Sequence, residues 1–252
     1  MEKLVVVLGP YRSGTSLVSQ ILSDLGVWFG PETKFQLPAD RYNPGGYFQR
    51  RDVVEVNRRL IESASGSIES PGKPDTILAE GDMGVLDFVD LAWTKGVDLA
   101  GLKDPRFSIT LLSWIRAGKF AQKELRIVRV ERRLSDVVAS ATKHHEVGSF
   151  GDYDASRLLR MTELYHRYAA WHTQNLDVPS ITVSFDRLKR EPVALIGELG
   201  VFLDMPDSDR VSHACKRVGK QRVLFKHYLK KLRNPRGLLE GLHKTAKHWL
   251  KR

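Results

Sequence analysis

The protein has 252 residues, of which 42% are hydrophobic and 28% are charged, a composition that is ordinary for a soluble globular protein. The single cysteine, Cys215, excludes an intrachain disulfide and a thiolate zinc site, and it fits a reducing, cytoplasmic location. No apolar run approaches the roughly 18 residues of a membrane span. The opening run 1–9 leads directly into a loop, which argues against a secretory signal.

The net charge of +10 is unevenly distributed along the chain. Residues 221–252 contain ten Lys and Arg and one acidic residue, whereas residues 1–220 contain 30 basic and 29 acidic residues. This pattern predicts a nearly neutral domain over residues 1–220 and a basic helical C-terminal extension over residues 221–252. A nearly neutral domain argues against a nucleic-acid partner.

The first half of the chain begins with a strand and a helix. The β-branched run 4–9 predicts a buried strand, and the apolar spacing that follows predicts a helix ending near Gly26. Residues 29–49 are rich in Pro and Gly and predict a long ordered loop. A helix follows around residues 53–61, with Asn57 on its apolar face. Residues 63–75 have the composition of a flexible segment, and residues 76–81 fit either a strand or the start of a helix.

The second half alternates strands with helices. The pattern predicts strands at 98–103, 125–130 and 181–185, and helices at 107–118, 134–141, 155–174 and 191–203. Such alternation predicts an α/β, P-loop-like three-layer fold with a mainly parallel central sheet flanked by helices. Ligands of these folds bind at the carboxyl ends of the strands.

The glycine-rich segment between the first strand and helix, GPYRSGTS (9–16), has the outline of a phosphate-binding loop. Gly9 and Gly14 have P-loop spacing, and Ser16 occupies the hydroxyl position. However, Thr15 stands where a P-loop ATPase has lysine, and Arg12 lies inside the loop. Backbone N–H groups and the helix N-terminus favour a terminal phosphate or sulfonate. A plain strand-to-helix turn is the alternative interpretation.

A second candidate anion site follows the strand at 125–130. Arg132 lies at the strand end, and Asp136 and Ser140 share one face of the next helix. Arginine binds a phosphate through two parallel hydrogen bonds, and a serine hydroxyl one turn away adds another. The alternative is a basic surface loop with a helix behind it.

With these two motifs, the sequence resembles the sulfotransferases that use 3′-phosphoadenosine-5′-phosphosulfate (PAPS). The resemblance covers most of residues 4–205. GPYRSGTSL is similar to the 5′-phosphosulfate loop of that family, and the spacing of Arg132 and Ser140 is similar to its 3′-phosphate motif. Three further segments resemble bacterial members or the late strand and helix of the family: NPGGYFQRRDVVEVN (43–57), GLKDPRF (101–107) and VSFDRLKREPVALIGELGVFL (183–203). Residues 1–220 would then form the sulfotransferase domain.

The resemblance implies a set of residues that bind PAPS. The 5′-phosphosulfate loop comprises Pro10, Tyr11, Arg12, Ser13, Gly14, Thr15 and Ser16. Arg132 and Ser140 would bind the 3′-phosphate, and Arg217 falls where family members have a basic loop over that phosphate. The resemblance also implies in-line transfer of the sulfonate without a metal ion. Arg12 and Lys103 are the candidates that stabilise the developing charge.

The same resemblance implies a base for a hydroxyl acceptor. Glu32 falls where carbohydrate and tyrosylprotein members carry a catalytic glutamate, and Asp104 is the rival candidate. Gln49 departs from the pattern, because the usual segment has a glutamate there and a neutral amide cannot act as a base. The acceptor stays open between a carbohydrate, a lipid-linked glycan, a small molecule and a peptide tyrosine.

Two other functions fit the same residues. One is a P-loop kinase that uses ATP, which the absent lysine disfavours and which a magnesium requirement would reveal. The other is a nucleotide- or glycan-binding module without turnover, for which the glutamine at position 49 leaves room.

The basic extension has an amphipathic pattern near its end. The apolar face comprises Leu238, Leu239, Leu242, Ala246, Trp249 and Leu250, and lysines lie mostly off that face. Such a helix suits an anionic membrane surface, as in peripheral attachment to the inner membrane, or a polyanionic glycan. It also suits docking on its own domain with a solvated basic side, which is the commoner arrangement of amphipathic helices.

Overall fold

The computed structural model of the protein describes residues 2–40, 43–143 and 154–219. Its described strands form one parallel sheet in the order β2-β1-β3-β4. The strands are β1 (Lys3–Leu8), β2 (Leu99–Lys103), β3 (Glu124–Glu131) and β4 (Ser180–Ser184). The predicted α/β fold with a mainly parallel sheet is confirmed.

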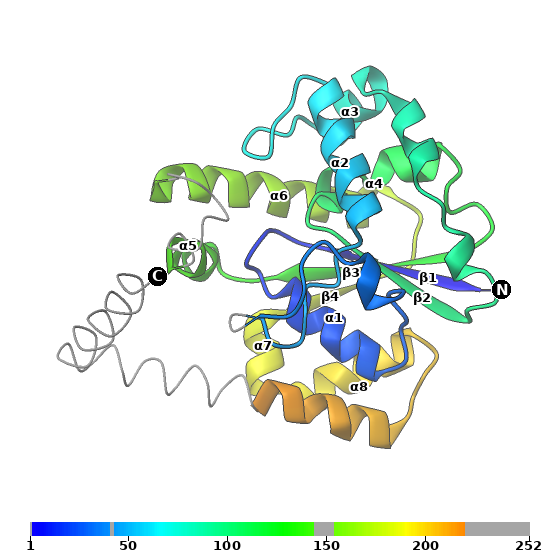
Figure 1. The fold of residues 1–252 in the computed structure, drawn as a ribbon. Helices are drawn as coiled ribbons and strands as arrows, with labels where there is room; N and C mark the ends of the chain where they lie inside the picture. Colours follow the sequence, from blue (N-terminus) through cyan, green and yellow to red (C-terminus); the bar gives the residue numbers. More distant parts are fainter. Residues whose placement is uncertain (1, 41–42, 144–153, 220–252) are drawn as a thin grey trace, which may run out of the picture.

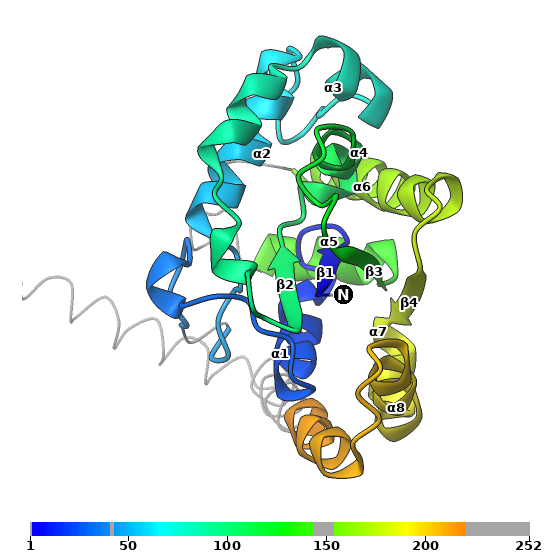
Figure 2. The ribbon, with the colours of Figure 1, turned by 90° about the vertical axis from the view of Figure 1, so that its right-hand side faces the viewer.

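Helices cover both faces of this sheet (Figures 1 and 2). One face carries α2 (Arg51–Ser63), α3 (Pro74–Glu80), α4 (Phe107–Arg116) and α6 (Ala155–Asn175). The other face carries α1 (Thr15–Asp24), α7 (Phe185–Arg190), α8 (Pro192–Phe202) and a further helix over residues 208–219. Short 3-10 turns are η1 (Glu32–Lys34), η2 (Met83–Phe88) and η3 (Ala92–Thr94). The three-layer arrangement is therefore confirmed.

The central strand β1 explains why the first apolar run is continuous rather than alternating. Leu4, Val6 and Leu8 point into the core beneath α2, α4 and α6, and Val5 and Val7 point into the core beneath α1 and α8. These five side chains are fully buried. A strand covered on both faces needs apolar residues at every position, which is the pattern of a parallel sheet.

Two further segments can be compared with their predictions. Residues 76–81, for which a strand and a helix start were both expected, belong mostly to α3, which begins with Pro74 in its first turn. The described residues of the segment 29–49 form the expected long loop, which contains the short turn η1. This loop is closed by an isolated antiparallel bridge between Phe35 and Arg50 and by a 2.7 Å hydrogen bond from the Gln36 N–H to the Gln49 carbonyl.

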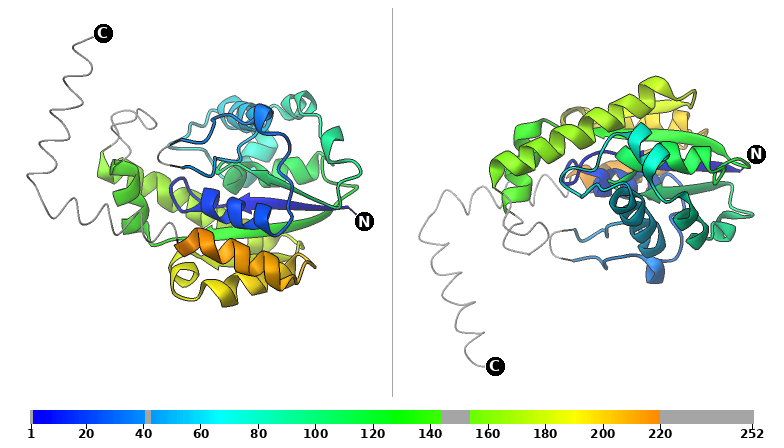
Figure 3. Two further views of the ribbon diagram at one scale, coloured as in Figure 1. Left: turned by 60° about the horizontal axis from the view of Figure 1, so that its bottom comes forward. Right: turned by 90° about the horizontal axis from the view of Figure 1, so that it is seen from above.

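The carboxyl ends of the parallel strands meet at one edge of the sheet. β1 ends there in the loop 9–14, β2 ends at Lys103, and β3 leads to Arg132 and α5 (Leu134–Lys143). Two further views show that β1 begins at the opposite end of the molecule from α5 (Figure 3). Among the described residues, no helix combines the length and the apolar character that crossing a membrane requires.

Candidate anion-binding site

The loop between β1 and α1 has a backbone shape that requires glycine. Gly9 and Gly14 have φ angles of 145° and 102°, and Arg12 has a φ of 64°. A Cβ atom at Gly14 would lie 2.4 Å from the ring of Phe185, and one at Gly9 would lie 2.8 Å from the Val130 carbonyl oxygen. Both positions therefore need a residue that lacks a side chain.

Hydrogen bonds fix the loop at its base and leave its far end open. The Gly9 N–H donates to Ser108 Oγ at 3.1 Å, and Ser13 Oγ donates to the Pro10 carbonyl at 2.7 Å. At the far end, no side chain in the described part of the chain caps the N-terminus of α1. The first-turn N–H groups of a helix carry partial positive charge and need acceptors. An anion bound in the loop would supply them.

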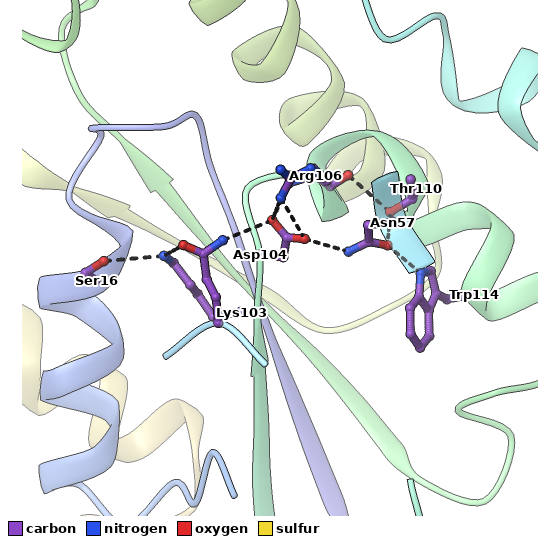
Figure 4. A network of polar contacts seen from close by, with 8 residues as sticks. Ser16, Asn57, Lys103, Asp104, Arg106, Thr110 and Trp114 are labelled. Atoms are coloured by element: carbon purple, nitrogen blue, oxygen red, sulfur yellow. Dashed lines mark hydrogen bonds and ion pairs between the residues drawn. The ribbon is translucent and has the colours of Figure 1, made fainter. Parts of the chain in front are cut away.

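A lysine reaches this loop from the neighbouring strand. Lys103, the last residue of β2, is buried, and its Nζ donates to Ser16 Oγ at 3.3 Å (Figure 4). Thr15, which occupies the usual lysine position of a P-loop, is itself buried. The ammonium group that the loop sequence lacks thus comes from an adjacent strand end.

The residues after β3 converge on the same loop. Arg132 Nη1 donates to the Arg12 carbonyl at 3.0 Å, and Arg12 Nε donates to Ser140 Oγ of α5 at 3.5 Å. The guanidinium of Arg132 also lies over the ring of Phe185, 4.7 Å from its centroid. The two motifs identified separately in the sequence therefore form one site.

One buried cation, Lys103, and two half-buried cations, Arg12 and Arg132, lie close together in this site. Burial lowers the pKa of Arg12, and the nearby charge of Arg132 lowers it further. Burial likewise lowers the pKa of Arg132. Burial lowers the pKa of Lys103 to about 7, with Arg12 and Arg106 adding to the shift against the opposing effect of Asp104. Cations that are partly removed from water and repel one another are stabilised when an anion binds between them.

A polar network extends from the loop into the core (Figure 4). Lys103 Nζ donates to Gln49 Oε1 at 3.3 Å, and Gln49 Nε2 donates to Asp104 Oδ1 at 3.4 Å. Asp104 is fully buried and also accepts from Asn57 Nδ2 at 3.0 Å and from Arg106 Nη1 at 3.0 Å. Asn57 Oδ1 in turn accepts from two residues of α4, namely Thr110 at 2.7 Å and Trp114 at 2.8 Å.

The two candidate bases lie in different environments. Asp104 has both carboxylate oxygens occupied by its partners in the network, and the Arg106 guanidinium is held against it. Glu32 is exposed, in the turn η1. Trp28 pairs in parallel with Ala100 of β2, so the chain after Trp28 runs towards the same sheet edge as Lys103. Glu32 takes no part in the described network.

Two other predicted residues lie away from the open end of the loop. Arg217 was expected in a basic loop over the 3′-phosphate. It lies instead on the helix 208–219 and forms an ion pair with Asp24, the last residue of α1, whereas the loop precedes the first residue of α1. The Tyr11 ring packs edge-on against Tyr165 of α6, with centroids 5.4 Å apart. The Tyr11 ring also lies beneath the Arg106 guanidinium, 5.6 Å from its carbon, so this side chain packs against α6 and the β2–α4 turn.

Sequence reasoning missed several residues that shape the site. Phe185 packs against Gly14 and carries Arg132 on its ring, and Lys189 Nζ lies 4.4 Å from the same centroid. Ser108 supports the first glycine of the loop from α4. Phe185 follows β4 directly and Lys189 lies in the same short helix, α7, so the rule that ligands bind beyond the carboxyl ends of strands could have identified them. Nothing in the local sequence indicates Ser108.

Metal binding has no obvious location in the part of the chain that the structure describes, because no group of three His, Cys, Asp or Glu side chains gathers there. The metal-free chemistry implied by the sequence resemblance stays a prediction.

Comparison with known proteins relates the fold to sulfotransferases. The solved sulfotransferase domain of the curacin biosynthetic pathway is 14% identical with a TM-score of 0.50, over 84% of this chain and 77% of that one. The sulfotransferase domain of the Synechococcus PCC 7002 olefin synthase is 15% identical with a TM-score of 0.51, over the same shares of the two chains. No protein-family model and no curated protein matches the chain. The chain therefore has the fold of bacterial sulfotransferase domains.

Proposed function

We propose that this protein is a PAPS-dependent sulfotransferase that moves a sulfonate group to a hydroxyl acceptor and releases 3′,5′-adenosine bisphosphate. The observation that carries the proposal is the cluster of buried Lys103 and half-buried Arg12 and Arg132 around a glycine loop and a helix N-terminus that no described side chain caps. A ligand with two separate anionic groups fits this cluster better than a single triphosphate chain does. The sulfotransferase fold agrees with it.

The described contacts suggest how the residues divide between the two anionic groups. The loop backbone, Ser16 and Lys103 surround the N-terminus of α1 and would hold the 5′-phosphosulfate. Arg132 and Ser140 approach Arg12 from the other side and would hold the 3′-phosphate. PAPS, when bound, supplies the sulfonate and a phosphate leaving group.

In the proposed reaction, the protein side chains would stabilise the developing negative charge and accept the proton of the acceptor hydroxyl. As the acceptor oxygen bonds to sulfur and the bond from sulfur to the bridging oxygen breaks, Arg12 and Lys103 would stabilise the charge on the sulfonate and bridging oxygens. A base must take the hydroxyl proton. Glu32 is our candidate, because Asp104 already has hydrogen-bond partners on both oxygens. A carbohydrate, a lipid-linked glycan and a small molecule are all suitable acceptors.

The decisive experiment is calorimetric titration with 3′,5′-adenosine bisphosphate, with magnesium-ATP and 5′-AMP as comparison ligands. We expect the bisphosphate to bind at about micromolar affinity and the other two to bind at least roughly tenfold more weakly, because each lacks one of the two anionic contacts. Preference for ATP would instead support a kinase, and bisphosphate binding without sulfonate transfer in an acceptor screen would support a binding module.

Neighbouring arginines provide a matched pair of variants for the same titration. Arg132→Ala should weaken bisphosphate binding by roughly tenfold or more, because it removes a partly buried phosphate ligand. Arg133→Ala should leave the affinity nearly unchanged, because its side chain is 71% exposed and already pairs with Asp136 and Asp186. Equal losses in the two variants would contradict the assignment of Arg132.

A further inference from the structure

Gln49 lies between a buried cation and a buried anion and contacts both. Its Oε1 accepts from Lys103 Nζ at 3.3 Å, and its Nε2 donates to Asp104 Oδ1 at 3.4 Å. An amide can accept from an ammonium through its oxygen and donate to a carboxylate through its nitrogen at the same time. A glutamate here would accept from Lys103 but would offer no donor to Asp104.

The carboxylate on the far side of Gln49 is held in place by the core. Asp104 is bonded to Asn57 of α2 and to Arg106, and Asn57 is fixed in turn by Thr110 and Trp114 of α4. Gln49 therefore links Lys103 to a rigid anchor. Among the described residues, Lys103 forms no ion pair with Asp104, although the two are adjacent in the chain.

The segment that carries Gln49 is itself attached to the first helix. Gln20 Nε2 of α1 donates to Asn43 Oδ1 at 3.1 Å, and Asn43 Nδ2 donates to the Gly46 carbonyl at 2.6 Å. A Cβ atom at Gly45 would lie 2.0 Å from the Gln20 side chain, so this segment packs tightly on α1. The position of Gln49 is thus fixed relative to the helix whose N-terminus faces the anion site.

We propose that Gln49 is a positioning residue that holds the Lys103 ammonium against Ser16 and the loop while keeping it apart from Asp104. This inference rests on the proposed function, because the role of Gln49 is to leave the positive charge of Lys103 uncompensated, so that a bound sulfonate or phosphate can interact with it. A glutamate at position 49 would form an ion pair with Lys103 and cancel part of that charge. The neutral glutamine keeps the cation available for an anionic ligand.

The test compares bisphosphate affinity between pH 7 and 9.5 in the wild type and in Gln49→Glu. The charged groups that act on Lys103 are Asp104, Arg12 and Arg106, and the two arginines stay charged over this range. We expect wild-type affinity to decline as Lys103 loses its proton. In Gln49→Glu, affinity at pH 7 should fall by roughly tenfold, and the decline should move to higher pH by about one pH unit or more.

Gln36→Glu is the matched control, because it adds the same charge to the exposed residue that pairs with Gln49 through the backbone. It should leave both the affinity and the pH profile unchanged. Gln49→Met keeps the length of the side chain but removes both hydrogen bonds, and it should weaken binding without moving the decline to higher pH. If Gln49→Glu binds and titrates as the wild type does, the inference is wrong.

A ligand-free measurement separates this inference from the proposed function. The Lys103 ammonium can be titrated by NMR in the unliganded protein, with Lys103→Met to assign its signal. A Lys103 pKa that rises in Gln49→Glu supports the positioning contact even if the wild type binds no bisphosphate, in which case only the proposed function fails. An unchanged Lys103 pKa overturns the inference whatever the bisphosphate does.

Discussion

Lys103 shows how one side chain can be unfavourable for folding and useful for binding. Its ammonium is buried beside two arginines, and its hydrogen bonds go to the neutral oxygens of Ser16 and Gln49. Burying a charge without a full ion pair costs free energy, which appears as the pKa of about 7. An anion in the loop would recover that free energy, so the unfavourable burial of the Lys103 charge in the unliganded protein favours ligand binding.

Replacing Lys103 with methionine should therefore stabilise the unliganded protein. The folded pKa is about 7 and the usual value is 10.5, so the unfolded state binds more protons between these pH values. The cost of the charged lysine is fully present below pH 7 and shrinks as the pH rises towards 10.5. We expect Lys103→Met to raise the free energy of unfolding by at least roughly 1 kcal/mol at pH 6, and by less at pH 9.

Denaturant unfolding at the two pH values measures this difference. The same variant should bind 3′,5′-adenosine bisphosphate at least roughly tenfold more weakly than the wild type at pH 6. Destabilisation at pH 6 would mean that Lys103 is a structural cation whose partners outweigh its burial.

At the scale of elements, the strands could be predicted because the residues of each strand and of the turn after it are enough to identify it. The β-branched residues of β1 and β3 and the glycine turn after β1 define their own boundaries. Helix 208–219 was not predicted, and this is why Arg217 was assigned to a loop. The placement of Arg217 depends on which helix packs beside the end of α1, and that contact with Asp24 joins residues 193 positions apart.

The packing of α6 on α4 includes a buried histidine that has no role in the proposed chemistry. His172 is fully buried, and among the described residues neither ring nitrogen has a well-formed hydrogen bond, although the backbone of Ser108 and Ile109 lies close enough to oppose part of the effect of burial. Burial lowers its pKa from 6.5 to about 4. In the unfolded chain His172 is protonated below about pH 6.5, whereas in the folded protein it stays neutral until the pH falls to about 4. Stability should fall as the pH drops through this window, by up to roughly 3 kcal/mol.

Comparing His172→Leu with the wild type at pH 7 and pH 4.5 tests this expectation. Leucine has a similar volume and no proton to bind, so the variant should lose less stability on acidification than the wild type. His213→Leu is the control, because that side chain is 65% exposed. Equal acid sensitivity in His172→Leu and the wild type would place the acid-sensitive group elsewhere.

For the whole molecule, the sequence predicts the class of fold and the two anion motifs but not the polar network. The loop 9–16 and the segment from Arg132 to Ser140 are local patterns, and their meeting follows from the parallel sheet. The contacts of Gln49 with Lys103 and Asp104 span 54 and 55 residues and depend on how the long loop folds back over β2. The glutamine at position 49 could be recognised from the sequence as unusual, but its contacts with Lys103 and Asp104 could be recognised only from the structure.

The distribution of charge over the whole chain leads to a last prediction. Residues 220–252 lie outside the described residues, so the predicted domain boundary and the amphipathic tail stay predictions from sequence. Each Lys or Arg near an anionic bilayer contributes about 1 kcal/mol of attraction. We expect the full chain to sediment with phosphatidylserine vesicles, and a chain lacking residues 237–252 to stay in solution.

Salt and lipid composition separate this electrostatic attachment from other contacts. Binding to anionic vesicles should weaken as ionic strength rises, and neutral vesicles should bind much less. Because the anion site belongs to the folded domain, the shortened chain should keep the bisphosphate affinity of the full chain. A shortened chain that still sediments would exclude membrane attachment through this segment. If the chain lacking residues 237–252 unfolds at a lower temperature than the full chain, the deleted segment packs on its own domain. Deleting a segment that only binds membrane would leave the unfolding temperature unchanged.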